Sequence, residues 1–178
     1  MSGHNKWAQI KHKKAITDSK KSKIFSKLVR FISVEAKLSG GKESPGLRAA
    51  IEKAKKVNMP SDNIERAIKK ASEPSAEMYS IAYEAYGPGG AGVIIETLTD
   101  SKNRTAQDIK HILSLNGTAL GGIGSVTWAF KREISPEGPI WTPTSTLPLE
   151  DADLELLEKL VNDLEENDDV QDVYTNAE

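Results

Sequence analysis

Apolar residues recur at helical spacing in the first part of the chain and predict three helices there. The first is expected from about Asp18 to Leu38, and the second from near Ser44-Pro45 to a stop before Pro60. The third is expected to begin at Ser61 or Asp62, where Asp62 and Glu65 have capping-box spacing. The positions expected to face a shared core are Ile24, Phe25, Leu28, Val29, Phe31, Ile32, Ala36, Leu47, Ala50, Ile51, Ala54, Val57, Ile64, Ala67, Ile68 and Ala71.

The period changes after a linker-like stretch at residues 73–77, beyond which strands and helices alternate. The order strand, strand, helix, strand, strand, helix, strand predicts an α+β fold of the ferredoxin-like kind, closing into one sheet with two helices on one face. The chain is therefore expected to be an α+β multidomain protein, with a basic three-helix domain at residues 1–72 and an α+β domain at residues 73–178. The expected elements are strands 79–86, 91–99, 125–132 and 170–175, a short extended piece around 140–146, and helices at 103–115 and across Leu154–Leu164.

Charge is distributed unevenly over these regions, although the 178 residues carry a net charge of only −2. Residues 1–70 have a net charge of +12 and residues 135–178 a net charge of −12. The near-neutral total therefore hides two strong and opposite electrostatic fields on one chain.

Composition excludes several classes of protein. Without cysteine there is no disulfide scaffold, thiolate nucleophile or cysteine-ligated zinc site. No apolar run approaches the roughly 20 residues that a membrane-spanning helix needs, and the N-terminus lacks the apolar region of a signal peptide. A cytoplasmic protein without a membrane partner is expected.

The basic N-terminal residues are the strongest candidates for chemistry. Lys20, Lys23, Lys27 and Arg30 are spaced three and four apart and form one ridge beside the apolar stripe, as phosphate binding requires. Trp7 lies within the preceding arm and would stack on a base. The alternative is a solvated lysine face with Trp7 packed on the helical domain.

Enzyme chemistry has little support in the sequence. Gly87-Pro88-Gly89-Gly90 lacks the spacing of a phosphate loop and is expected to be a hairpin turn. Gly121-Gly122-Ile123-Gly124 leads into a strand, so the anion-binding geometry of a helix N-terminus is expected to be missing. The histidines have no metal-ligand spacing, and the acidic pairs near the C-terminus lie on an exposed helix. No catalytic residue, metal, cofactor or small-molecule substrate is expected.

Arg104 has two interpretations. It stands near the start of a predicted helix, where it would hold an anion together with the helix dipole. The alternative is that this segment only caps the helix, with Asp100 or Asn103 accepting from free N–H groups.

Six separated blocks of this sequence resemble the YebC/PmpR family, which includes the mitochondrial translational activator of cytochrome c oxidase. The resemblance implies a helical N-terminal domain followed by two α+β domains, and no enzymatic activity. Members usually carry a third domain inserted after the strand that is expected to end near Arg132, and this chain passes that point with only residues 133–139. A short form lacking that domain is therefore expected. The blocks are Gly3–His12, Asn58–Lys70, Tyr83–Gly90, Thr99–Thr105, Gly124–Phe130 and Asp169–Asn176.

The family resemblance also implies a function. Members are described as DNA-binding transcriptional regulators and as ribosome-associated translation factors, and both roles need a surface that binds nucleic acid. The expected partners are DNA, ribosomal RNA or tRNA, and the ribosome. The residues expected to face nucleic acid, from the basic pattern and the resemblance together, are Lys6, Trp7, Lys11, His12, Lys13, Lys14, Lys20, Lys21, Lys23, Lys27, Arg30, Arg66, Lys69, Lys70 and Arg104.

Two alternatives involve the acidic end of the chain. In the first, the protein is an interaction module whose acidic C-terminal helix contacts a basic partner. In the second, the acidic end inhibits the basic arm by competing with phosphate for the same lysines.

Overall fold

The computed structural model describes residue 7 and residues 18–71, 73, 77–136 and 138–178, which form two compact units. The helical unit comprises Thr17–Met78 and Arg132–Ile140. The α+β unit comprises Tyr79–Lys131 and Trp141–Glu178, together with Trp7. The sequence predicted a single boundary after residue 72, whereas in the structure Trp7 belongs to the α+β unit and Arg132–Ile140 to the helical unit.

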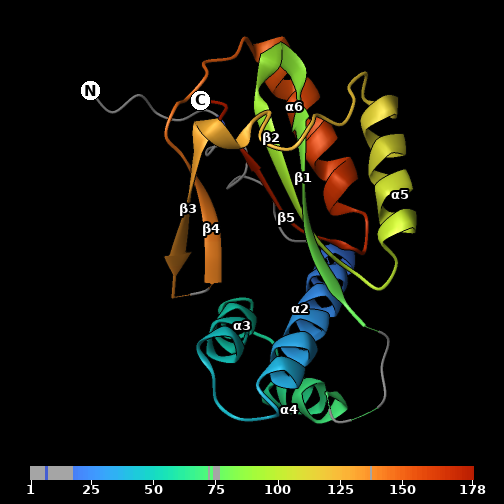
Figure 1. The fold of residues 1–178 in the computed structure, drawn as a ribbon, viewed down its shortest axis with the longest axis vertical. Coiled ribbons are helices and arrows are strands. Elements are labelled where there is room, and N and C mark those ends of the chain that lie inside the picture. Colours follow the sequence, from blue (N-terminus) through green and yellow to red (C-terminus); the bar gives the residue numbers. More distant parts are fainter. Residues whose placement is uncertain (1–6, 8–17, 72, 74–76, 137) are drawn as a thin grey trace. The chain divides into compact units, whose positions relative to one another are not determined.

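The helical unit contains helices α2 (Asp18–Leu38), α3 (Pro45–Lys56) and α4 (Ser61–Lys70) (Figure 1). α3 begins where the sequence predicted, and Ser44 caps it, because its side chain accepts a hydrogen bond from the Leu47 N–H at 3.1 Å. The predicted capping box of α4 is wrong. Its N-cap residue is Pro60, which has no side-chain acceptor, and backbone bonds to the Pro60 carbonyl close the first turn instead.

The core of the helical unit consists of the apolar stripes predicted from the sequence. Ile32, Ala36, Ala50 and Ala54 are completely buried, and the remaining predicted positions are buried or packed against them. The alanines of α3 let that helix approach α2 closely, since they project little beyond the backbone.

The α+β unit is built on a three-stranded antiparallel sheet with the order β1-β2-β5. Its strands are β1 (Tyr79–Tyr86), β2 (Gly92–Thr99) and β5 (Val170–Thr175). β1 and β2 form the predicted hairpin, joined by the short 3₁₀ turn η1 (Pro88–Gly90). Gly89 has φ of 66°, and a Cβ atom there would lie 2.5 Å from the Leu149 side chain, so this turn requires glycine.

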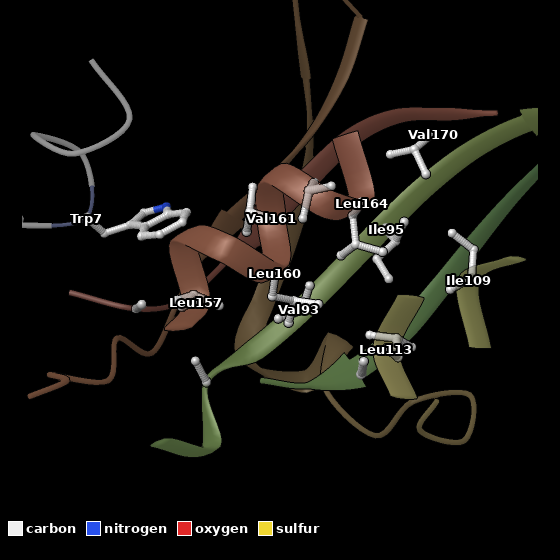
Figure 2. Packing of buried hydrophobic residues seen from close by; sticks show 14 of the residues in the cluster. Trp7, Val93, Ile95, Ile109, Leu113, Leu157, Leu160, Val161, Leu164 and Val170 are labelled. Carbon is white, nitrogen blue, oxygen red and sulfur yellow. The ribbon is translucent and has the colours of Figure 1, made fainter. Parts of the chain in front are cut away.

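Two helices cover one face of this sheet, as predicted (Figure 1). They are α5 (Lys102–Leu115) and α6 (Asp151–Glu165). Val93 and Ile95 of β2 point toward them, and all five predicted apolar positions of α6 are buried in the same cluster (Figure 2). The bounds of α6 and β5 agree with the expectation because the leucine spacing and the β-branched run are both distinct.

The other face of the sheet differs from the prediction. Ile94 of β2 packs there on Val126, Ala129 and Phe130. The predicted strand at residues 125–132 is instead a 3₁₀ turn, η2 (Thr127–Ala129), followed by β3 (Phe130–Ser135). β3 pairs with β4 (Gly138–Pro143) in a separate two-stranded sheet, so the expectation of one closed sheet is wrong.

The same turn changes the position of one aromatic residue. Strand alternation over residues 125–132 would place Trp128 on one face with Val126 and Phe130, but it is 68% exposed while they are buried. The N–H groups of Val126 and Thr127 donate to the Glu84 carboxylate and are therefore unavailable to a strand partner.

Within the described ranges, no helix is long and apolar enough to cross a bilayer.

Candidate nucleic-acid interface

The cationic row predicted on α2 lies beside the buried stripe of that helix. Lys20, Lys23, Lys27 and Arg30 follow one another at intervals of about one turn and are half-buried, while Lys21 is exposed. A half-buried lysine or arginine commonly packs its aliphatic stem on the protein and keeps its charged end at the surface. This arrangement gives α2 a linear array of positive charge on a rigid element.

The second group of predicted cations lies on α4. Arg66, Lys69 and Lys70 are exposed, because Ile64 and Ala67 occupy the buried side of that short helix. α4 packs on α2, and the Ser33 hydroxyl of α2 donates to the Ala67 carbonyl of α4 at 2.9 Å. The two basic helices therefore form one packed pair within the helical unit.

Several cations of α3 contact neighbouring side chains. Arg48 donates two hydrogen bonds to Glu43 at 3.1 and 2.7 Å, and Lys55 pairs with Glu52 at 3.3 Å. The Lys53 ammonium lies 5.7 Å from the centre of the Phe31 ring. The candidate interface is the row of cations on α2 together with the exposed cations of α4.

Overall, Thr17–Met78 carries 14 Lys and Arg residues and 8 Asp and Glu residues. One of these acids, Glu35 of α2, is half-buried against Gly46, and burial raises its pKa. Basic residues therefore outnumber acidic ones in this segment. The other predicted cations of the arm, Lys6, Lys11, His12, Lys13 and Lys14, lie outside the described residues.

Trp7 occupies a position that the sequence did not predict. Its ring is 8% exposed and belongs to the apolar cluster of the α+β unit, directed toward Leu157 and Val161 of α6 (Figure 2). A ring this buried offers no face to a base, so the proposed stacking role does not fit this placement. The alternative, packing on the helical domain, also fails, because the cluster that holds Trp7 is the core of the other unit.

Arg104 is engaged with carboxylates of its own unit. Its guanidinium donates to Asp169 at 2.8 Å and pairs with Asp100 at 2.9 Å, and these bonds, that to Asp169 first, raise the pKa of Arg104. Asp169 is 4% exposed and also accepts from the Thr105 hydroxyl at 2.7 Å. The anion that Arg104 holds is therefore an internal one, and its predicted contact with nucleic acid has no support in this geometry. The capping alternative is wrong about the capping residue. The N-cap is Ser101, not Asp100 or Asn103, and its side chain makes no capping bond.

Sequence reasoning missed a second internal anion site. The Glu84 carboxylate accepts from the N–H groups of Gly124, Val126 and Thr127 at 2.7, 2.9 and 3.0 Å. The loop after Gly121 does therefore form an anion-binding concavity, contrary to expectation, and Glu84 fills it. Burial alone would raise the pKa of Glu84, but these three bonds and one from the Thr127 hydroxyl together lower it. The sequence contained one signal for this site, namely a glutamate at an inward-facing position of a predicted strand together with a glycine-rich loop.

Metal chemistry finds no support in the part of the chain that the structure describes. There, no three His, Asp or Glu side chains gather closely enough to hold a metal ion. The candidate site is the set of cations on α2 and α4.

Comparison with known sequences identifies the family. A sequence model described as the TACO1/YebC protein N-terminal domain matches residues 5–74, and one described as the TACO1/YebC second and third domain matches residues 78–135 and 133–177. The chain belongs to the TACO1/YebC family. The second match comes in two pieces that meet at residues 133–135, where the sequence predicts that an inserted domain is missing.

Individual relatives agree with this assignment. A "Probable transcriptional regulatory protein" of Fervidobacterium nodosum is 40% identical over 99% of this chain and 93% of its own length. One of Chlorobium luteolum with the same name is 50% identical over 92% of this chain and 67% of its own. The crystal structure of a "Conserved Hypothetical Protein Aq1575" of Aquifex aeolicus has a TM-score of 0.81 and 34% identity, covering 97% of this chain and 96% of that one.

Proposed function

We propose that this protein is a non-catalytic, cytoplasmic regulator of gene expression that binds the phosphate backbone of nucleic acid through α2 and α4. The observation that carries the proposal is the row of cations at one-turn intervals along α2, next to the exposed cations of α4. Evenly spaced cations on a rigid helix match the repeated negative charge of a phosphate backbone. The relatives' names support a regulatory role.

The proposed mode of binding is recognition of phosphate and shape. Backbone contacts fix the position of a protein on nucleic acid, while sequence is read by side chains that reach base edges. The proposed contacts are lysine and arginine side chains alone, with the Trp7 ring buried. We therefore expect affinity to depend little on base sequence.

A matched pair of variants tests the interface. Lys20, Lys23 and Lys27 are changed to Gln in one full-length protein, and Lys42, Arg48 and Lys55 to Gln in the other, so that both lose three charges. The proposal expects the first variant to lose at least about tenfold in affinity for a 20-base-pair duplex, as three lost phosphate contacts imply, and the control to lose much less. Equal losses would show that only net charge matters, which would overturn the interface.

Transcription and translation differ in the nucleic acid that is bound. Crosslinking in cells followed by sequencing of the bound nucleic acid identifies promoter DNA in the first case and ribosomal RNA or tRNA in the second. Sedimentation of a lysate with and without nuclease provides an independent check, since only a ribosome-bound protein would comigrate with ribosomes.

A second candidate function is suggested by α6. Its apolar face is buried, so its acids lie on the outer face, where a basic partner protein would bind. Replacing Glu155, Glu158 and Glu165 by Gln tests this function. Lost partner binding with intact nucleic-acid affinity would support an interaction module, whereas tighter nucleic-acid binding at low salt would support inhibition by the acidic end.

A further inference from the structure

A small pocket lies on the α+β unit, where the end of β1 meets η2. Its volume is about 150 Å³, and the residues that line it include Tyr86, Trp128, Val126 and Leu147. Tyr86 is 45% exposed and Trp128 68% exposed, whereas Val126, which also lines the pocket, is buried. Two exposed aromatic residues therefore line the pocket together with buried apolar ones.

Hydrogen bonds hold both rings in place. The Tyr86 hydroxyl and the Trp128 indole N–H donate to the same acceptor, the Ser125 carbonyl, at 2.5 and 2.9 Å. The Glu84 carboxylate fixes the surrounding loop through its bonds to the Gly124, Val126 and Thr127 N–H groups. Rings that are already ordered lose little conformational entropy on binding, which is typical of a recognition site.

The volume of the pocket limits what it can hold. Pockets for whole small-molecule ligands usually measure about 300–1,000 Å³. An apolar cavity of about 150 Å³ holds a single benzene molecule. The pocket therefore matches one ring-sized side chain.

Charge around the pocket limits the class of partner. The Thr146 hydroxyl, in the pocket wall, donates to the Glu178 carboxylate at 2.6 Å. Asp153 lies beside Gly89, next to the pocket residue Gly90, since a Cβ on Gly89 would come within 3.0 Å of its carboxylate. The segments Tyr79–Lys131 and Trp141–Glu178 carry 5 Lys and Arg residues against 16 Asp and Glu residues. A polyanion would be repelled here, and a basic chain attracted.

We propose that this pocket binds a phenyl-sized apolar side chain presented by a basic segment of a partner protein. Tyr86 and Trp128 would enclose the ring, while Glu178 and Asp153 would pair with flanking lysines or arginines. An apolar anchor surrounded by complementary charges is a usual form of protein recognition. This site uses neither α2 nor α4, so it is independent of the proposed nucleic-acid function.

The probe for this site is a fluorescein-labelled Lys-Lys-Phe-Lys-Lys peptide, titrated with the full-length protein by fluorescence anisotropy at about 50 mM salt, where screening is weak. We expect saturable binding that weakens at least about tenfold when the peptide phenylalanine becomes alanine, or when Trp128 becomes Ala, the usual loss for a central anchor. Ile123→Ala is the matched control, because Ile123 is a fully exposed apolar residue of the same loop outside the pocket wall. It should bind as the parent protein does.

Further variants separate pocket binding from attraction to acidic surface. Glu178→Gln should weaken binding more than Glu165→Gln does. Both substitutions remove one negative charge, but Glu165 lies about 18 Å along α6 from Asp153, the acid beside the pocket. Trp128→Phe should retain much of the affinity that Trp128→Ala loses, and an unchanged melting temperature would show that both remain folded. Equal binding of the phenylalanine and alanine peptides would overturn the proposal. The proposal would also be overturned if Trp128→Ala weakened the binding of a fluorescein-labelled oligo(dT) strand but not that of the peptide, because that result would indicate base stacking.

Discussion

The Thr105 hydroxyl donates to the buried Asp169 carboxylate at 2.7 Å, joining the first turn of α5 to the residue that precedes β5. Arg104 donates to the same oxygen at 2.8 Å, and the Thr99 hydroxyl lies 3.3 Å from it. One carboxylate therefore links the end of β2 and the start of α5 to a residue more than 60 positions away in sequence. The position of Asp169 explains why Arg104 stabilises the fold, although in the sequence it resembles a residue that binds an external anion.

Asp169→Ala should lower the free energy of unfolding by about 2–3 kcal/mol, because the Thr105 and Thr99 hydroxyls would lose a buried acceptor. Urea denaturation measures this change. Glu155→Ala, at an exposed residue of α6, is the control and should change stability by less than about 0.5 kcal/mol. Arg104→Gln should destabilise the protein slightly and leave its nucleic-acid affinity unchanged. A large loss of that affinity would restore Arg104 to the interface.

Glu84→Gln should destabilise the α+β unit by about 1–3 kcal/mol at neutral pH, since an amide satisfies the loop N–H groups less well than a carboxylate. The folded state lowers the pKa of Glu84 below its ordinary value of 4.5, so its contribution is present above about pH 4.5. It is lost as the pH falls through the lower folded-state pKa. Thermal melts of both proteins between pH 7 and pH 3 should therefore converge in acid, and a difference that is constant with pH would contradict this assignment.

Trp7→Ala should lower the stability of the α+β unit by about 3 kcal/mol, because it removes a large ring from a packed cluster. Trp128→Ala removes the same side chain from an exposed position and should have a much smaller effect. Differential scanning calorimetry of the two variants makes the comparison. Equal melting temperatures for Trp7→Ala and the parent protein would contradict the burial of this ring.

Local patterns predicted most of the helices and strands because each depends on neighbouring residues. The stripe along α2 and the leucines of α6 determine which side of each helix is buried, whatever the rest of the chain does. The error at η2 arose from a long-range contact. Residues 125–132 alternate like a strand, but Glu84, 42 residues before Val126, binds their N–H groups and turns the segment.

The candidate site was predictable to a similar extent. Spacing alone placed Lys20, Lys23, Lys27 and Arg30 on one side of α2, and the exposure of the α4 cations followed from the same rule. The environments of Trp7 and Arg104 depend on Leu157 and Asp169, which are more than 60 residues away in sequence. No local pattern encodes such contacts, so both residues were assigned by type alone.

The dependence of nucleic-acid affinity on salt tests the central claim most directly. Binding of a 20-base-pair duplex is measured across a series of salt concentrations for the parent protein and for the Lys20, Lys23 and Lys27 to Gln variant. The parent slope of log K against log salt should correspond to on the order of 5–10 phosphate contacts, and the variant slope should be shallower by about 2.7, or 0.9 for each lost contact. A parent slope near zero, or equal slopes for the two proteins, would contradict a phosphate-binding interface on α2.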